Sequence, residues 1–147
     1  MNHKKIFILS TAFIIVILDQ FSKFLIKKNF QINESIPIIK NIFNLTYITN
    51  TGSAFGLFKG YNIFFILFSA IVIIVIFYFL KKIKKDETKI QFAVSLLLGG
   101  TIGNLIDRLL YGSVIDFIDF RIWPVFNLAD SSVTIGVVLL IVLLWEN

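Results

Sequence analysis

Four long apolar stretches constrain the fold of this 147-residue chain more than any other feature. They cover about residues 6–26, 61–80, 90–106 and 133–145. A helix that crosses a bilayer needs roughly 20 mostly apolar residues. The whole chain is 57% hydrophobic with a mean hydropathy of +0.88, which is unusual for a soluble domain of this length. We therefore expect an all-α membrane protein with four transmembrane helices, folded as a single domain over residues 1–147.

The first and last stretches need separate interpretation. Lys4 and Lys5 precede the first stretch, as basic residues precede the apolar region of a secretory signal peptide. No small-residue cleavage site follows, so we expect an uncleaved first span. The last stretch has only 13 residues unless residues 130–132 are included, which predicts a short or tilted span.

A cluster of lysines between the second and third stretches predicts the topology. Lys81, Lys82, Lys84, Lys85 and Lys89 place five cations within nine residues. Such clusters lie on the cytoplasmic side of membrane proteins, so we expect this loop and both termini in the cytoplasm. Because the cations directly follow an apolar segment, the net charge of +5 indicates contact with anionic lipid and no nucleic-acid partner.

Two segments then lie on the outer side, roughly residues 27–60 and 107–132. Residues 43–49 alternate between apolar and polar types, which predicts a short strand, and residues 50–52 supply a turn signal. The second segment also has an extended pattern around Pro124. We expect a small extracytoplasmic β-rich cap on the membrane surface.

The near absence of cysteine and histidine directs attention to the carboxylates. The chain has no cysteine, which excludes disulfides, thiolate nucleophiles and the usual structural zinc sites. The only histidine, His3, is at the extreme N-terminus and is a poor candidate for a catalytic base. Placing a carboxylate in or near the hydrocarbon of a bilayer costs free energy, so such residues are expected to have a specific role. Six of the nine acidic residues fall on the outer side or at its boundary: Asp19, Glu34, Asp107, Asp116, Asp119 and Asp130.

Late in the first span, Asp19 and Lys23 are four residues apart and can form an ion pair on one helix face. An anchor at the membrane surface and a functional role are equally compatible with this spacing. Gln20 makes the polar patch larger than an anchor requires.

The end of the third span combines small and polar residues. Gly99 and Gly103 have the GxxxG spacing that allows another helix to approach closely. Asn104, Asp107 and Arg108 follow, and a polar surface there is expected to face a site. Arg108 is one of only two arginines against 12 lysines, so we expect its guanidinium to hold a carboxylate or a backbone carbonyl in fixed geometry.

Asp116 and Asp130 are each flanked by apolar residues. An apolar environment raises a carboxyl pKa, and two adjacent carboxyls can share one proton. Such a pair can deprotonate a water and protonate a departing amine, which is the chemistry of peptide hydrolysis. Two alternatives remain open at this point. Asp130 could be the N-cap of the fourth span, and Asp119 could take the place of Asp116.

Five groups of residues along the chain form an ordered set of motifs: Asp19, Gln20 and Lys23; Asn50, Thr51, Gly52, Ser53, Ala54 and Phe55; Gly99, Gly100, Gly103, Asn104, Asp107 and Arg108; Val114, Ile115, Asp116 and Phe117; and Phe126, Asn127, Ala129, Asp130 and Ser131. In order and spacing this set resembles the motifs of the bacterial lipoprotein signal peptidases (signal peptidase II). The resemblance covers nearly the whole chain. One departure is that many members carry a longer basic C-terminal tail, whereas this chain stops at Asn147.

The resemblance implies a membrane aspartyl endopeptidase that removes signal peptides from diacylglyceryl-modified prolipoproteins, cleaving before the lipidated cysteine. It implies a catalytic dyad of Asp116 and Asp130, with Asp119 outside it. The outer segments correspond to a β-cradle and a mobile lid. The supporting and substrate-binding positions map to Asp19, Lys23, Asn50, Gly103, Asn104, Arg108, Asn127 and Ala129.

The same resemblance implies a bacterial cytoplasmic membrane protein with its active site near the outer face. Its partners are the lipidated prolipoprotein and membrane lipid, and we expect a monomer without metal or cofactor. A small transporter is a rival interpretation, but it predicts acidic residues in mid-span, whereas these gather at one edge. A non-catalytic scaffold is a second rival, and it leaves the two apolar-flanked aspartates unexplained.

Overall fold

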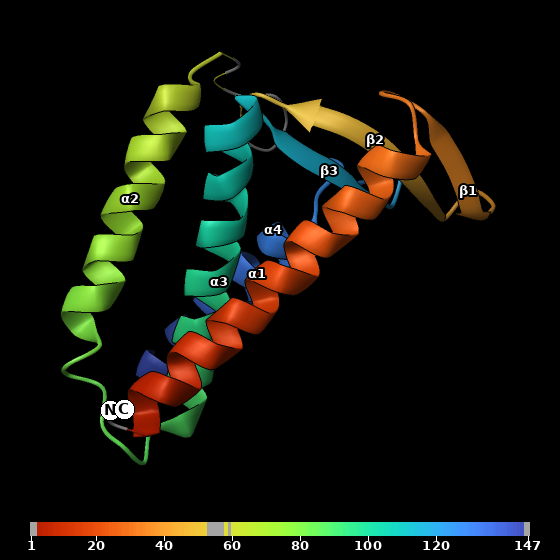
Figure 1. Cartoon of the computed structure of the whole chain (residues 1–147). Coiled ribbons are helices and arrows are strands. Elements are labelled where there is room, and N and C mark those ends of the chain that lie inside the picture. The colour runs from red at the N-terminus through yellow and green to blue at the C-terminus, as the bar shows by residue number, and fades with distance from the viewer. Residues whose placement is uncertain (1–2, 53–57, 59, 146–147) are drawn as a thin grey trace.

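The structure is a computed structural model that describes residues 3–52, 58 and 60–145. In this part of the chain, four long helices carry a small three-stranded sheet at one end (Figure 1). The elements are, in order, α1 (His3–Asn29), β1 (Ser35–Ile39), β2 (Phe43–Asn50), α2 (Asn62–Phe79), α3 (Thr88–Tyr111), β3 (Val114–Asp119) and α4 (Leu128–Trp145).

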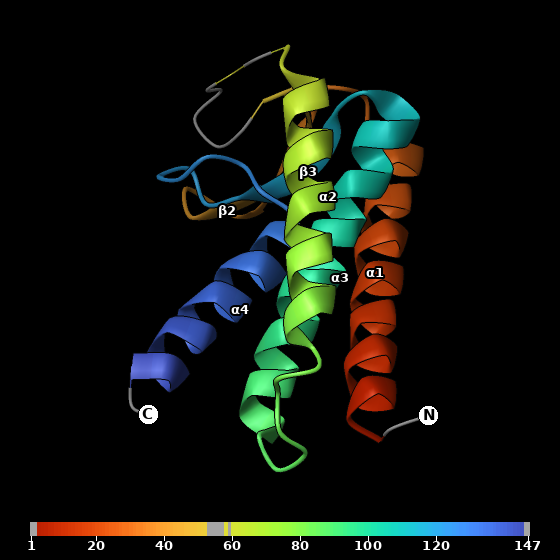
Figure 2. The ribbon, with the colours of Figure 1, turned by 90° about the vertical axis from the view of Figure 1, so that its left-hand side faces the viewer.

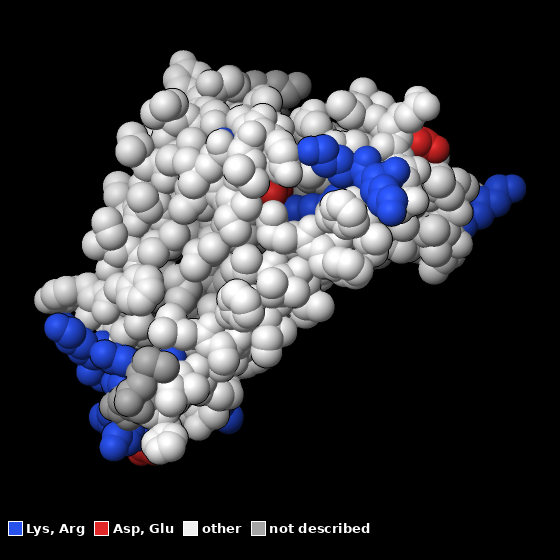
Figure 3. Space-filling model, viewed as in Figure 1, with Lys and Arg blue, Asp and Glu red and all other residues white. Residues whose placement is uncertain are grey.

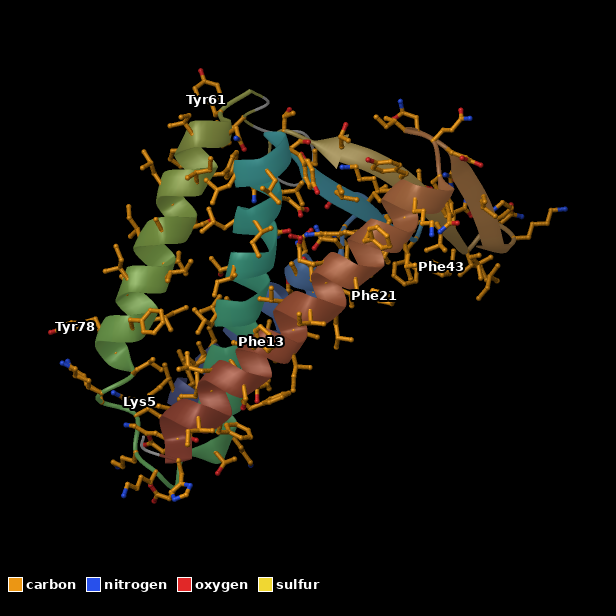
Figure 4. The ribbon with its side chains drawn as sticks, in the orientation of Figure 1. Lys5, Phe13, Phe21, Phe43, Tyr61 and Tyr78 are labelled. Carbon is orange, nitrogen blue, oxygen red and sulfur yellow. The ribbon has the colours of Figure 1, made fainter. Side chains whose placement is uncertain are left out.

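All four helices are long and apolar enough to cross a membrane, which confirms the predicted spans. The chain runs back and forth, so its two ends lie at the same end of the bundle as the α2–α3 connection (Figures 1 and 2). Tyr61 and Tyr78 mark the two ends of α2, where the amphipathic ring of tyrosine suits a membrane interface (Figure 4). On the face shown in Figure 3, charged side chains gather at both ends and leave an uncharged belt between them.

Helix α3 lies at the centre of the bundle and packs against α1, α2 and α4. Its glycines allow this close packing. A Cβ atom on Gly99 would come within 2.8 Å of the Ala12 carbonyl oxygen on α1, and a Cβ on Gly100 would overlap the Ala129 carbonyl oxygen on α4. The predicted packing role of the GxxxG glycines is therefore confirmed at Gly99.

Replacement of Gly99 by Ala is expected to lower thermal stability, because the obstacle is the backbone of α1 and both helices must move apart. The expected cost is about 1–3 kcal/mol, typical of overpacking. Thermal unfolding in detergent measures this change. Leu110→Ala on the same helix is the control, since Leu110 is 66% exposed. Equal melting temperatures for the two variants would contradict the close approach.

The sheet is antiparallel with strand order β1-β2-β3 and lies at the end of the bundle opposite the termini (Figure 1). Ile115 and Phe117 of β3 pack with Tyr47 of β2 and Ile26 of α1 in a small buried cluster. This cluster joins the sheet to the first helix. The predicted strand at residues 43–49 and the β-rich cap are confirmed, whereas β1 was not predicted from the sequence.

Two helices extend beyond the apolar stretches that predicted them. Helix α3 continues past residue 106 to Tyr111, so Asp107 and Arg108 are helical, and Gly112 ends the helix in the left-handed conformation with φ of 71°. Helix α4 begins at Leu128, five residues before the predicted start. Ser53, Ala54 and Phe55 of the second motif lie outside the described residues.

Candidate active site

Asp116 faces away from the small core of the sheet. Side chains alternate between the two faces of a strand, so Ile115 and Phe117 point into the core while Asp116 points to the other face with Val114. Only 2% of Asp116 is exposed. Its two carboxylate oxygens accept hydrogen bonds from the side-chain amides of Asn50, at 3.0 Å, and Asn127, at 2.7 Å.

Asp130 lies in the first turn of α4 as part of a reciprocal capping arrangement. The Asp130 backbone N–H donates to Asn127 Oδ1 at 2.8 Å, and the Asn127 backbone N–H donates to Asp130 Oδ2 at 3.3 Å. The residue that caps the helix is therefore Asn127, so the alternative that Asp130 is the N-cap is wrong. Its second oxygen, Oδ1, accepts a hydrogen bond of 2.7 Å from the Asn104 amide.

Asn127 joins the two aspartates in one network. Its side-chain amide donates to Asp116, and its backbone N–H donates to Asp130. Asn127 is fully buried, so this bridge is shielded from water. Burial of Asp116, and the negative charge of Asp130 next to it, raise the pKa of the Asp116 carboxyl to about 7. A proton can therefore be held at Asp116 close to neutral pH.

A buried charge cluster supports this network from the side of α1. Lys23 forms ion pairs with Asp19 at 2.8 Å and with Asp107 at 2.9 Å, and all three side chains are at most 2% exposed. Lys23 also donates to Asn104 Oδ1 at 3.0 Å, which turns the Asn104 amide nitrogen toward Asp130. The Asp19–Lys23 pair is therefore an interior element, and a surface anchor is excluded.

Asp107 was expected to face a site together with Asn104 and Arg108, but it was not among the supporting positions that the resemblance implied. Its carboxylate accepts hydrogen bonds from the Ile115 backbone N–H at 3.1 Å and the Gln20 amide at 3.0 Å, in addition to its ion pair with Lys23. It thereby ties α1 and α3 to the strand that carries Asp116. Its place in the site could have been predicted from spacing, because Asp107 follows Asn104 by three residues and therefore lies on the same face of the helix.

Gly103 and Ala129 allow α1, α3 and α4 to converge beside the dyad. The Ala129 backbone N–H donates to Asp19 Oδ1 at 3.0 Å. A Cβ on Gly103 would lie 2.5 Å from Asp19 Oδ2 and 3.3 Å from the Ala129 Cβ. Small residues are therefore needed at both positions, and Gln20 closes the junction by donating to the Gly103 carbonyl at 3.1 Å.

Arg108 holds the chain that follows β2. Its guanidinium donates to the Gly52 carbonyl at 3.3 Å and lies 4.9 Å from the centre of the Phe65 ring. Of the two expected partners for Arg108, the structure therefore contains the backbone carbonyl. In the described residues the guanidinium makes no ion pair with Asp116 or Asp130.

Asp119 is engaged elsewhere. It accepts hydrogen bonds from Thr46 Oγ1 at 2.8 Å and from Arg121, whose guanidinium is 3.1 Å away. Burial acts to raise the pKa of Asp119, but the bonds from Thr46 and Arg121 outweigh it and lower that pKa. Asp119 does not line the cavity described next, so the structure does not favour it as the partner of Asp130.

Asp116 and Asp130 line the same groove, which has a volume of about 950 Å³. Its lining residues come mainly from α2, α3, α4 and the β3–α4 connection. Figure 2 shows how these elements are arranged. Most of the residues that line the groove are apolar. The polar residues Asn50, Asn104 and Arg108 also line it, together with the two carboxylates. Within the described ranges, no three His, Cys, Asp or Glu side chains form a group suited to hold a metal ion.

Comparisons with known proteins place this arrangement in a family. Residues 11–146 match the family model described as signal peptidase (SPase) II. Proteins named lipoprotein signal peptidase are similar: that of Halothermothrix orenii is 47% identical, over 91% of this chain and 92% of its own, and that of Staphylococcus aureus is 42% identical, over 99% and 93%. A solved structure described as a bacterial membrane enzyme superposes with a TM-score of 0.87 at 40% identity, covering 95% of this chain and 87% of that one. The chain therefore belongs to the signal peptidase II family of membrane proteases.

Proposed function

We propose that this protein removes signal peptides from diacylglyceryl-modified prolipoproteins, cleaving before the lipidated cysteine, with Asp116 and Asp130 as its catalytic dyad. The observation that carries the proposal is that Asn127 connects the two carboxylates and both line one groove. The names of the relatives support the reaction, and the raised pKa of Asp116 supports a dyad that shares a proton.

In the proposed mechanism a water lies between the two carboxyl groups, one ionised and one protonated. The ionised carboxylate accepts a proton from the water while the water oxygen attacks the scissile carbonyl carbon. The protonated carboxyl donates its proton to the carbonyl oxygen, which stabilises the tetrahedral intermediate. Collapse of that intermediate breaks the C–N bond, and a dyad proton goes to the departing amine. The water is consumed, both products are released, and no covalent enzyme intermediate forms.

The supporting residues have distinct tasks in this proposal. Asn50, Asn104 and Asn127 orient the carboxylates through their amides. Four residues, namely Asp19, Lys23, Gly103 and Ala129, fix the junction of the three helices behind the dyad. Arg108 positions the Gly52 backbone at the edge of the groove.

The apolar walls of the groove suit the acyl chains of the substrate. Phe65, Phe68 and Val72 on α2 face Val133 and Val137 on α4 across it. A diacylglyceryl group that stays in the bilayer could therefore enter sideways, with its cysteine next to the dyad. We propose membrane lipid as the second partner and the monomer, a single peptidase domain, as the working unit.

The proposed orientation has both termini and the α2–α3 connection in the cytoplasm and the dyad near the outer face. It rests on the lysines in and next to that connection, namely Lys81, Lys82, Lys84, Lys85 and Lys89. The two basic clusters on the face in Figure 3 lie at opposite ends, so the density of lysines decides the assignment.

The substrate proposal predicts that cleavage depends on the lipid of the substrate. A diacylglyceryl-modified prolipoprotein peptide should be cut at the bond before its cysteine, and the same peptide with an unmodified cysteine should be cut at least about a hundredfold more slowly, because the lipid supplies binding energy that positions the bond. Mass spectrometry of the products in detergent measures both the rate and the cleaved bond. Equal rates for the two peptides, or a cut at another bond, would contradict the proposal.

A further inference from the structure

A second cavity, separate from the groove, lies between the outer part of α1, the end of α3 and β3. It has a volume of about 510 Å³ and shares no lining residue with the groove that holds the dyad. Its floor contains Lys23 and Asp107, and its rim contains Lys27, Lys28 and Tyr111. The proposed peptidase mechanism uses none of the rim residues.

The charges on the floor are already compensated. Lys23 pairs with Asp107 and with Asp19, and the Asp107 oxygens also accept bonds from Gln20 and the Ile115 backbone. The three ionised side chains together carry one net negative charge. Lys27 and Lys28 add two positive charges, so the cavity and its rim carry an excess of one positive charge.

The rim lysines are available for an anion. Both are exposed, and among the described residues neither forms an ion pair. The Lys27 ammonium lies 3.8 Å from the centre of the Tyr111 ring, and the Lys28 ammonium lies 6.0 Å from that of Phe24. Figure 3 shows basic side chains gathered over this end of α1, beside a hollow with acidic atoms inside.

The surroundings of the cavity point to a lipid as the source of that anion. Phe24, which lines it, is 56% exposed. Phe13 and Phe21, which lie along α1 and are labelled in Figure 4, are 65% and 58% exposed. In a membrane helix such side chains contact acyl chains, and Tyr111 at the rim is of the type found at the interface. A ligand here would have an anionic head and an apolar body.

We propose that this cavity binds the phosphate of an anionic phospholipid, with the acyl chains lying along the exposed aromatic face of α1. Lys27 and Lys28 contact the phosphate, and Phe24 and Phe21 contact the chains. The lipid belongs to the leaflet that surrounds the sheet end of the molecule. The assignment is independent of the peptidase proposal.

The test is native mass spectrometry of the full chain released from micelles that contain phosphatidylglycerol or phosphatidylcholine. The wild type should retain phosphatidylglycerol in preference to phosphatidylcholine. The double variant Lys27→Gln/Lys28→Gln should lose that preference by about tenfold to thirtyfold, since each lysine near a membrane surface contributes roughly a factor of five. Both lysines are exposed, so the fold tolerates the change.

Two matched variants and one added anion make the result specific. Lys27→Arg/Lys28→Arg keeps the charges and should keep the preference, and Lys40→Gln, an exposed lysine in the β1–β2 turn, should have no effect. Equal retention of phosphatidylglycerol by the wild type and the Gln variant would overturn the proposal. If inorganic phosphate at the lipid concentration displaced phosphatidylglycerol completely, the site would be one for a free anion, and the lipid assignment would be wrong.

Discussion

Replacement of Asp116 or Asp130 by Asn is expected to reduce the cleavage rate of a lipidated prolipoprotein by at least about a thousandfold. Asn can neither accept a proton from water nor donate one to the departing amine, and acid-base catalysis by positioned groups contributes roughly 10² to 10⁴ per group. Because the two residues act as one unit, the double variant should be hardly slower than either single variant. The values of kcat/KM in detergent measure both effects.

The matched control is Asp119→Asn, the same substitution three residues along β3. Asp119 is engaged with Thr46 and Arg121 and lies outside the groove, so the rate should stay within about threefold of the wild type. If Asp119→Asn abolished cleavage in a folded protein while Asp116→Asn did not, Asp119 would take the place of Asp116 in the dyad.

Lys23→Met is expected to have the largest effect on stability. Loss of the ammonium leaves the Asp19 and Asp107 carboxylates buried without their common partner. Breaking a buried ion pair in this way costs about 3–5 kcal/mol, which corresponds to a fall in melting temperature on the order of 10 °C for a chain of this size. Thermal unfolding followed by tryptophan fluorescence in detergent measures the shift.

Two further variants separate the charge effect from a general loss of packing. Lys27→Met, on the same helix but exposed, should shift the melting temperature by less than about 2 °C. The double variant Lys23→Met/Asp107→Asn should recover part of the loss, because one uncompensated carboxylate is removed. A double variant as unstable as the sum of its two single changes would show that charge compensation is not the cause.

The helices could be predicted from the sequence because hydropathy and length suffice for membrane spans. The first and last residues of the helices could not be predicted in this way, because a helix that continues out of the apolar region there contains polar residues. Residues 107–111 extend α3, and the local stop signal is Gly112, which adopts the left-handed conformation at the helix end. The start of α4 had a signal too, since Asn127 and Asp130 have the spacing of a reciprocal cap.

The strand β1 was missed for a different reason. It is a five-residue edge strand with every residue exposed, and it contains Pro37, so no alternation marks it. Its pairing with β2 depends on the tight turn near Asn41, whose φ is 64°. The hairpin pairing with β2 defines this strand more than its own residues do.

The choice between Asp116 and Asp119 shows what the site required beyond the sequence. Apolar flanks pointed to both residues, and only the family resemblance favoured Asp116. In a strand, two residues three positions apart face opposite sides, so Asp116 points to the groove and Asp119 does not. The alternation of side chains could distinguish Asp116 from Asp119 only once the bounds of β3 were known and Ile115 and Phe117 were known to face the core.

The partners of Asp107 could not be predicted from the sequence, because they depend on the packing of α1 against α3. Spacing along α1 predicted the Asp19–Lys23 pair, which the structure confirms. Nothing in the local pattern showed that Lys23 would also reach Asp107 and Asn104 on another helix. The support for the dyad therefore comes from three elements that meet only in the folded chain.

The most direct test of the central claim, that Asp116 and Asp130 act as one coupled acid-base pair, is the pH dependence of kcat/KM with a chelator present. At low pH both carboxyls are protonated and neither can accept a proton from water. At high pH both are ionised and neither can donate one. The pKa of Asp116, raised to about 7, places the loss of the shared proton there, so a bell-shaped profile with an alkaline limb of about that apparent pKa is expected, unchanged by chelation. A flat profile across neutral pH, or activity that chelation removes and zinc restores, would contradict the account.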